Sequence, residues 1–271
     1  MEEFILITEA KIAVRKYESV DNAIVFLHNS SGSMDIWDQQ FNDPQFKDYS
    51  MICFDLPGHG KSSHSKQPEK DYTLPAMADN VLQILNSLSL HRYIIVAVSL
   101  STNFVAEIAD KLVNCEGIFM IGASVIGQGI SPADILLPFE FGAALFEENP
   151  DNYMLDNYMR GLYYKSNSVL QEKLMRNYLA ADARFRQNIG ASIAKGEWKD
   201  ETVNLALLRK NIAWIYGEKE QIINAGYLNK INISKWRNNI FSIPDAGHLA
   251  HLDQPEIFNR LLLEFAIDAF N

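Results

Sequence analysis

The stretch YIIVAVSLSTNF, residues 93–104, decides how this 271-residue chain is interpreted. An apolar run typical of a buried strand ends abruptly at Ser99, and a helical pattern begins directly after it. A strand that turns sharply into a helix at a serine is the layout of a nucleophile elbow, in which a strained turn exposes a reactive hydroxyl group. The alternative is a plain turn whose serine only caps the helix. A nucleophile would need a base and a third group that holds the base.

Strand and helix patterns alternate on both sides of this stretch. Short, almost continuous apolar runs, typical of strands buried on both faces of a parallel sheet, occur at residues 22–28, 50–56, 92–98, 116–122 and 211–217. Helical patterns lie between them, and the last helix is expected to open with a capping box formed by Asp253 and Glu256. The sequence therefore predicts an α/β fold with a mainly parallel sheet flanked by helices.

The alternation stops between residues 125 and 202. About four helical patterns follow one another there, at residues 133–146, 150–164, 168–182 and 183–196, with many Phe and Tyr residues and no strand pattern. Such an insertion predicts an all-helical lid over the carboxyl edge of the sheet, where α/β folds place their sites. The predicted domains are a core of residues 1–124 and 203–271 and a lid of residues 125–202. Arg184 and Arg186 are interpreted as solvent-facing lid residues, with a substrate carboxylate as the alternative partner.

The composition gives no sign of a nucleic-acid or membrane partner. The formal net charge is −10, so the chain has no electrostatic reason to bind nucleic acid or an anionic membrane. The start, MEEFILITEAKIAV, is acidic and its apolar run is too short for a signal peptide, and no stretch approaches the length of a membrane span. Cys53 and Cys115 lie in strand-like runs and are expected to be reduced core residues. We expect a soluble cytoplasmic protein.

Candidate partners for Ser99 follow two later strands. Glu220 comes three residues after the turn glycine of the strand at 211–217, and His248 lies in the loop before the final helix. Taken alone, a glutamate after a turn is usually a solvated loop residue, and a loop histidine is usually a polar surface group. Together the three residues fall at strand ends that should meet at one edge of the sheet. This pattern favours a triad in which His248 takes the proton of Ser99 and Glu220 holds His248.

A negatively charged intermediate needs two backbone N–H donors. One is expected from Leu100, directly after the serine, and the other from the loop HNSSGS at 28–33, with Ser30 the first candidate and Asn29 the next. His248 and His251 lack a third ligand pattern, so no metal site is predicted. No glycine-rich phosphate loop follows a strand, and no cofactor is expected.

Three segments carry a resemblance to a known family. DLPGHGKSS (55–63), VAVSLST (96–102) and IPDAGHLAHLDQPEIFNRLLLEF (243–265) resemble the α/β-hydrolase superfamily across nearly the whole chain. The GQG at 127–129, the helical segment after it and the glutamate at the acid position are similar to N-acyl-homoserine lactonases of this fold. The resemblance implies Ser99 as nucleophile, Glu220 as acid, His248 as base and Tyr158 as a substrate hydrogen-bond donor.

The chain departs from the family pattern at the predicted oxyanion site. Asn29 follows His28 where the family usually has glycine, and Ala97 and Ser101 flank the serine where glycines are usual. Alanine and serine are the next smallest residues, and asparagine tolerates a positive φ, so the steric requirements are mostly met. We expect these departures to affect the catalytic rate more than the fold.

The leading hypothesis is a cofactor-free serine hydrolase that cleaves a small-molecule carboxylic ester or lactone. The resemblance makes an N-acyl-homoserine lactone the candidate substrate. Two alternatives stay open. One is a carbon–carbon bond hydrolase of the same fold, and the other is a non-catalytic small-molecule receptor, which the altered elbow and oxyanion loop motivate.

Overall fold

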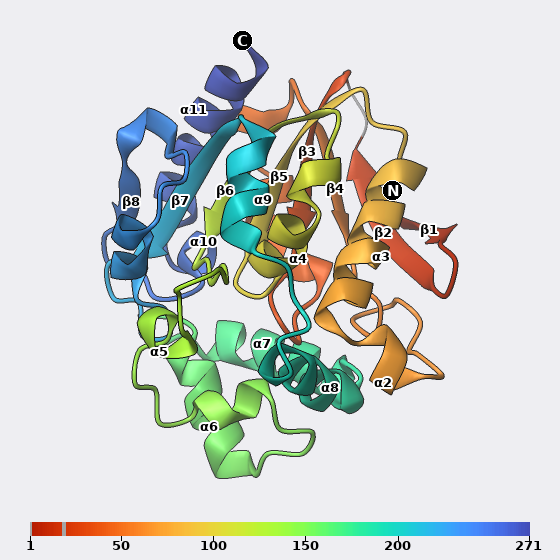
Figure 1. Cartoon of the computed structure of the whole chain (residues 1–271), viewed down its shortest axis with the longest axis vertical. Coiled ribbons are helices and arrows are strands. Elements are labelled where there is room, and N and C mark those ends of the chain that lie inside the picture. Colours follow the sequence, from red (N-terminus) through yellow and green to blue (C-terminus); the bar gives the residue numbers. More distant parts are fainter. Residues whose placement is uncertain (1, 18–19) are drawn as a thin grey trace.

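The computed structural model describes residues 2–17 and 20–271, which form a sheet covered by helices (Figure 1). The described residues build eight strands in the order β1-β2-β4-β3-β5-β6-β7-β8. Their bounds are β1 Glu2–Leu6, β2 Lys11–Tyr17, β3 Asn22–Leu27, β4 Ser50–Phe54, β5 Arg92–Val98, β6 Cys115–Ile121, β7 Asn211–Gly217 and β8 Ile240–Ile243. Strands β3 to β8 pair in parallel, whereas β1 and β2 pair antiparallel. The predicted fold class is confirmed.

The five predicted strands correspond to β3, β4, β5, β6 and β7. Their residues are almost all buried, as expected for central parallel strands. Strands β1, β2 and β8 are absent from the five predicted ranges. Strand β2 buries only three of its seven residues, and β8 is four residues long at one edge of the sheet. Strand β1 lies at the other edge and alternates exposed and half-buried residues. Its short, half-solvated pattern carries less apolar signal than the central strands do.

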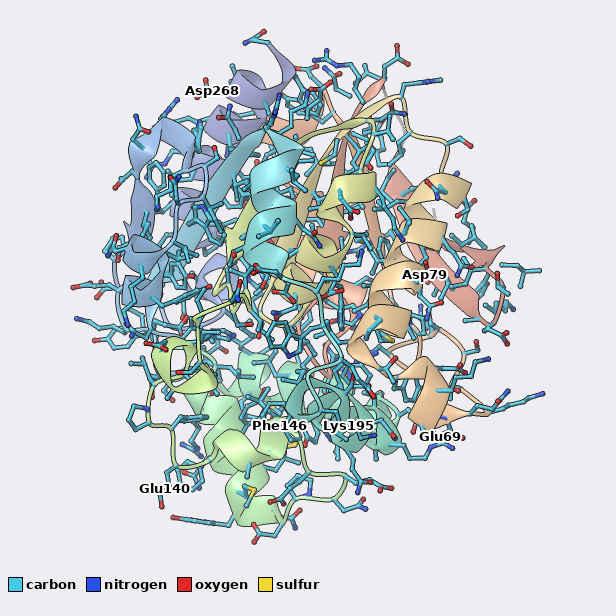
Figure 2. All side chains as sticks on the ribbon, in the orientation of Figure 1. Glu69, Asp79, Glu140, Phe146, Lys195 and Asp268 are labelled. Atoms are coloured by element: carbon cyan, nitrogen blue, oxygen red, sulfur yellow. The ribbon has the colours of Figure 1, made fainter. Side chains whose placement is uncertain are left out.

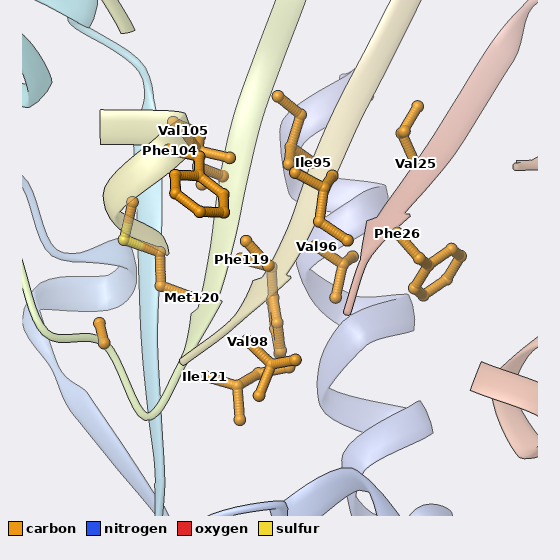
Figure 3. Close-up of a cluster of buried hydrophobic side chains, with 14 of the residues drawn as sticks. Val25, Phe26, Ile95, Val96, Val98, Phe104, Val105, Phe119, Met120 and Ile121 are labelled. Carbon is orange, nitrogen blue, oxygen red and sulfur yellow. The ribbon is translucent and has the colours of Figure 1, made fainter. Parts of the chain in front are cut away.

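Helices cover both faces of the sheet. The longer core helices are α3 Leu74–Ser87, α4 Ser101–Glu107, α9 Glu201–Leu208 and α11 Pro255–Phe270. Phe119 of β6 packs against Phe258 and Phe265 of α11, with ring centroids 5.5 and 5.4 Å apart. Figure 3 shows this core with Phe104 and Val105 of α4 beside side chains of β3, β5 and β6. Each such side chain contributes about 1.5–3 kcal/mol by its burial, so the core fixes the strand ends that carry the site.

Short helices complete the core. They are α1 Asp38–Phe41, α2 Pro68–Asp71 and α10 Ala250–Asp253. Cys53 and Cys115 are buried and are not joined by a disulfide, in agreement with the prediction of reduced core residues. In the described part of the chain, no helix is long and apolar enough to cross a membrane.

Residues 125–202, which we call the helical segment, lie below the sheet in Figure 1. They contain α5 Pro132–Ile135, α6 Asn152–Gly161, α7 Ser168–Ala180 and α8 Ala183–Ala194. Helices α6 and α7 begin at side-chain caps, since Asp151 accepts from the Met154 N–H at 2.7 Å and Asn167 accepts from the Leu170 N–H at 3.0 Å.

The first helical pattern of this segment, over 133–146, is wrong as a continuous helix. Only α5 and a 3₁₀ turn at Gly142–Leu145 form there. The backbone between them is used elsewhere: Leu136 pairs with Ile223, and the Leu137 N–H donates to the Ile222 carbonyl at 2.9 Å. These contacts with a distant loop compete with helix formation, and Pro138 cannot donate within a helix.

The predicted capping box of the last helix is also wrong. Helix α11 begins at Pro255, and its N-cap residue Gln254 makes no side-chain cap hydrogen bond. The Asp253 carboxylate instead accepts the N–H of Gly247 at 2.8 Å and the N–H of Tyr164 at 2.9 Å. Asp253 therefore ties the loop that carries His248 to the helical segment.

Candidate active site

Ser99 stands at the end of β5 in a strained conformation. Its φ is +57°, which is unusual for a residue other than glycine. Its N–H donates to the Ile121 carbonyl at 2.8 Å, and its carbonyl accepts the N–H and hydroxyl of Thr102 at 2.9 and 2.6 Å. Three hydrogen bonds thus hold the turn between strand and helix, which is the geometry of a nucleophile elbow.

The residues beside Ser99 are small because the elbow is crowded. Ala97 lies within the sheet opposite Leu27 of β3. Ser101 is fully buried at the start of α4, and its hydroxyl donates to the His28 carbonyl. The departure from glycine at position 101 therefore supplies a bond between the elbow and the loop after β3.

Glu220 and His248 form a buried pair. Nδ1 of His248 lies 3.0 and 2.9 Å from the two carboxylate oxygens of Glu220. One of these oxygens also accepts the N–H groups of Ile222 and Ile223 at 2.8 and 3.2 Å. Burial alone would raise the pKa of Glu220, but the charge and hydrogen bond of His248 and the two N–H groups hold it below its ordinary value. An ionised Glu220 places the imidazole proton on Nδ1 and leaves Nε2 as the acceptor.

Gly122 connects this pair to Ser99. It follows Ile121, which accepts the Ser99 N–H, and it has a φ of +53°. A Cβ atom at Gly122 would lie 2.6 Å from Cε1 of His248, so only glycine lets the ring approach β6 this closely. The structure places Ser99, Glu220 and His248 at one edge of the sheet. Gly122 is not among the predicted site residues, although a glycine directly after a buried strand is a visible signal.

Ser99 lines a mainly apolar cavity. Leu100 and Ser30, the candidate oxyanion residues, line the same cavity. The other lining residues are Asn103, Ser124, Ile126, Ile135, Leu136, Leu145, Phe146, Ile193, Ile222 and Ile223. The helical segment supplies about half of this wall, including Phe146, which Figure 2 labels. The arrangement can bury an apolar group next to the Ser99 hydroxyl.

Two candidate binding residues lie outside this lining. Asn29 is buried, and its amide donates to the Ser30 carbonyl at 3.0 Å. Tyr158 of α6 is buried between the rings of Phe139 and Tyr178, with centroid distances of 6.3 and 6.1 Å. Neither side chain forms part of the cavity lining.

Two buried histidines hold the loop that carries Ser30. Nε2 of His28 accepts the Leu56 N–H at 3.0 Å, and Nε2 of His59 accepts the Ser31 N–H at 3.2 Å. Nδ1 of His28 faces the Asn29 carbonyl and Nδ1 of His59 faces the Pro57 carbonyl, so both Nδ1 atoms act as donors. Burial lowers the pKa of both rings, and the proximity of His28 lowers that of His59 further. Both imidazoles are therefore neutral.

Arg186 is buried, so its interpretation as a solvent-facing residue is wrong. It is only 4% exposed. Its guanidinium donates to the carbonyls of Glu147 and Glu148 at 2.9 and 2.8 Å and to the Ser31 hydroxyl at 3.3 Å. Arg184, in contrast, is 42% exposed at its side chain and pairs with Asp182. The spacing of Arg186 to the buried Ile189, three residues later, was the available signal.

No candidate metal site accompanies these groups. Within residues 2–17 and 20–271, no cluster of three or more His, Cys, Asp or Glu side chains is arranged to hold a metal ion.

Comparisons with known proteins agree with this geometry at the level of the fold. The chain is 21% identical over 225 residues to the chloroplastic protein PHYLLO of Arabidopsis thaliana, which covers 75% of this chain. It is 23% identical over 249 residues to the dihydrolipoyllysine-residue acetyltransferase component of the acetoin cleaving system of Pseudomonas putida, which covers 89% of this chain. The chain spans only 13% of the first protein and 62% of the second.

Solved structures match along nearly the whole chain. A variant of the N-acyl homoserine lactonase AidH in complex with N-hexanoyl homoserine lactone has a TM-score of 0.90 at 20% identity, with 99% of this chain and 98% of that chain covered. The esterase EaEST of Exiguobacterium antarcticum has a TM-score of 0.80 at 19% identity, with 98% and 100% covered. At these identities the likeness concerns the fold.

The family assignment rests on a longer match of sequence pattern. The profile of the alpha/beta hydrolase fold family matches residues 22–255, from the start of β3 to the start of α11. This range contains the elbow, the Glu220–His248 pair and the helical segment. The resemblance noted from the sequence is thereby confirmed, and the chain belongs to the alpha/beta hydrolase fold family.

Proposed function

We propose that this protein is a cofactor-free serine hydrolase of carboxylic esters or lactones. Ser99 is the nucleophile, His248 the base and Glu220 the group that holds the base. A single observation carries the proposal. Nδ1 of His248 lies 2.9 Å from a carboxylate oxygen of Glu220, at the same edge of the sheet as Ser99, whose φ is +57°. The esterase and lactonase neighbours support the same class of reaction.

The reaction follows from the protonation states at the site. As Oγ of Ser99 attacks the carbonyl carbon of the substrate, Nε2 of His248 takes the proton of the Ser99 hydroxyl. The imidazolium, stabilised by Glu220, then gives this proton to the leaving alcohol, and an acyl-enzyme forms. A water molecule deprotonated by His248 attacks the acyl carbon and releases the acid and Ser99. For a lactone, the alcohol and the acid stay in one ring-opened molecule.

The N–H groups of Ser30 and Leu100 are the proposed oxyanion donors. Both residues line the cavity beside Ser99. Within the described part of the chain, neither N–H donates a hydrogen bond to another residue, so both can serve a developing oxyanion. The two neighbours of Ser30 are held by hydrogen bonds. His28 binds the Asn29 carbonyl, and His59 and Arg186 bind the N–H and the hydroxyl of Ser31, which supports the position of the Ser30 N–H.

The cavity wall favours a substrate with an apolar chain. Burying each methylene group contributes about 0.8 kcal/mol, so affinity should rise with chain length until the cavity is full. The likeness to AidH with N-hexanoyl homoserine lactone makes an N-acyl-homoserine lactone the proposed substrate, and the helical segment the proposed lid. The proposed partners are therefore small molecules alone.

A panel of p-nitrophenyl esters and acyl lactones of increasing chain length tests the proposal. We expect hydrolysis that is lost in Ser99→Ala, together with rapid labelling of Ser99 by a fluorophosphonate probe. Mass spectrometry should detect the hydrated, ring-opened product of a lactone, which closes again in acid. Turnover of esters without any lactone opening would contradict the lactone substrate only. A wild-type protein that neither turns over nor labels would indicate a receptor instead.

A further inference from the structure

Two polar side chains interrupt the apolar wall of the cavity. Asn103 of α4 and Ser124, three residues after β6, line the same cavity as Ser99. The proposed triad and oxyanion donors do not use either of them. A polar group in an apolar cavity wall costs free energy unless it is paired, which makes the partners of these two residues informative.

The hydrogen bonds fix the orientation of the Asn103 amide. Its Nδ2 atom donates to the Ser124 carbonyl at 2.8 Å and to the two carboxyl oxygens of Glu201 at 3.2 and 2.9 Å. The Ser124 carbonyl can only accept, so the amide nitrogen must face it. The Oδ1 atom therefore faces the Ser124 hydroxyl, 2.8 Å away.

The position of the hydroxyl proton determines which hydrogen bond Ser124 can make to a ligand. A serine hydroxyl has one proton, and that of Ser124 is used by Oδ1 of Asn103. Its oxygen keeps its lone pairs. Ser124 is therefore a hydrogen-bond acceptor, and not a donor, at the cavity wall.

Glu201 holds this arrangement in place. The side chain is fully buried, and it accepts the Ile126 N–H at 2.7 Å in addition to the amide of Asn103. The Glu201 N–H in turn donates to the Ile126 carbonyl at 3.0 Å. Glu201 thus joins the two ends of the helical segment and fixes Asn103 from behind. The Asn103–Ser124 pair is therefore oriented by groups of the protein alone.

Ser124 is also close to the nucleophile through the backbone. Its N–H donates to Oγ1 of Thr102 at 3.3 Å, and that hydroxyl donates to the Ser99 carbonyl at 2.6 Å. Two hydrogen bonds through Thr102 therefore connect Ser124 to Ser99. A substrate whose carbonyl carbon meets Ser99 would place its neighbouring atoms near Ser124.

We propose that the Ser124 hydroxyl oxygen, oriented by Asn103 and Glu201, selects esters or lactones that carry an N–H or O–H donor within a few bonds of the scissile carbonyl. This inference rests on the proposed function, because it names the substrate class of the same site. A matching donor pairs with the lone pairs of this oxygen, whereas a methylene in the same place leaves those lone pairs without a donor.

Matched substrates test this selection. One ester carries a hydroxyl or amide N–H near the carbonyl, and the other carries a methylene at that position. We expect the wild-type kcat/KM to be about five- to tenfold higher for the donor-bearing ester, and Ser124→Ala to reduce this ratio to near one. The control Ile193→Val changes an apolar lining residue and should leave the ratio unchanged. A wild-type ratio near one, or a ratio that survives in Ser124→Ala, overturns the proposal.

A binding experiment separates this inference from the proposed function. Calorimetry with Ser99→Ala compares the two esters without turnover, and Ser99→Ala/Ser124→Ala repeats the comparison. If the wild-type protein cleaves neither ester but the donor-bearing ester binds more tightly in a way that needs Ser124, the selection stands and the hydrolase proposal fails. If both esters are cleaved and bound equally well, the hydrolase proposal stands and the selection fails. Equal binding without cleavage overturns both.

Discussion

Arg186 of the helical segment donates a hydrogen bond to the hydroxyl of Ser31, 3.3 Å away in the loop after β3. Ser31 has a φ of +53° and directly follows Ser30, a proposed oxyanion donor. The carbonyls of Glu147 and Glu148 fix the guanidinium on its other side. The buried Arg186 side chain therefore joins the helical segment to the loop that carries the proposed oxyanion donor Ser30.

The first prediction concerns this link. Ser31→Ala removes the hydroxyl while leaving the Arg186 carbonyl contacts in place. We expect kcat to fall about three- to tenfold with little change in KM, because the loop acts on the transition state more than on substrate binding. Arg184→Ala, which removes a half-exposed neighbour, is the control and should keep the wild-type kcat. An unchanged kcat in Ser31→Ala would show that the link has no part in turnover.

A second prediction uses the backbone strain at Ser99. Glycine adopts a φ of +57° without the steric cost that serine has, so Ser99→Gly should stabilise the fold by about 1 kcal/mol while it abolishes turnover. The exposed Ser89 has a φ of +50° and is a matched control. Ser89→Gly should stabilise the protein by a similar amount and keep activity. Urea denaturation and ester hydrolysis measure both effects, and a less stable Ser99→Gly protein would refute the strain argument.

The class of fold and the elbow could be predicted from the sequence because their signals are local. A continuous apolar run that ends at Ser99 indicates a central strand buried on both faces, and a helical pattern begins directly after it. Edge strands such as β1 give a weaker signal because solvent covers one side of them.

The hydrogen-bond partners of the supporting residues could not be predicted, because most of these partners are distant in the sequence. Asp253 has the spacing of a helix cap, yet it binds N–H groups of Gly247 and Tyr164. Arg186 has the composition of a surface residue, yet its partners lie up to 155 positions away. Local propensity favours the cap and the exposed side chain, and tertiary hydrogen bonds override it in both cases.

A third prediction follows from the lowered pKa of Glu220. The folded-state pKa lies below the unfolded value of about 4.3, so the pair contributes stability above that pH and loses it as the pH falls through the folded-state pKa. Glu220→Gln should therefore be less stable than the wild type at neutral pH, with a difference that shrinks in acid. Its kcat should fall by about 10³-fold or more, because a neutral amide no longer holds the imidazole proton on Nδ1. A stability difference that does not vary with pH would contradict this assignment.

The fourth prediction separates two roles for Tyr158. If its hydroxyl binds substrate, as the resemblance to lactonases implies, Tyr158→Phe should lower kcat/KM for acyl lactones about tenfold without a change in stability. If the ring only packs between Phe139 and Tyr178, the same variant should keep wild-type kinetics. Tyr178→Phe is the control, because its hydroxyl donates to the Ala144 carbonyl and its loss should lower stability alone. Steady-state kinetics and thermal denaturation of the two variants distinguish the roles.

The last prediction concerns Glu201, whose pKa burial raises well above the ordinary value. The folded protein keeps this carboxyl proton to a higher pH than the unfolded chain does. Its contribution to stability is therefore largest below about pH 4.3 and falls as the pH rises toward the folded-state pKa. Glu201→Gln has nearly the same shape, and its oxygen can still accept the N–H groups of Ile126 and Asn103. The variant should gain stability relative to the wild type as the pH is raised from 4 to 8, measured by urea denaturation at each pH. Glu218→Gln, at an exposed site where the Asp245 N–H and Lys219 lower the pKa of the carboxyl, should show no such gain. A wild-type protein that becomes more stable than Glu201→Gln at high pH would mean that the buried carboxylate is ionised and paired, and the argument from burial would be wrong.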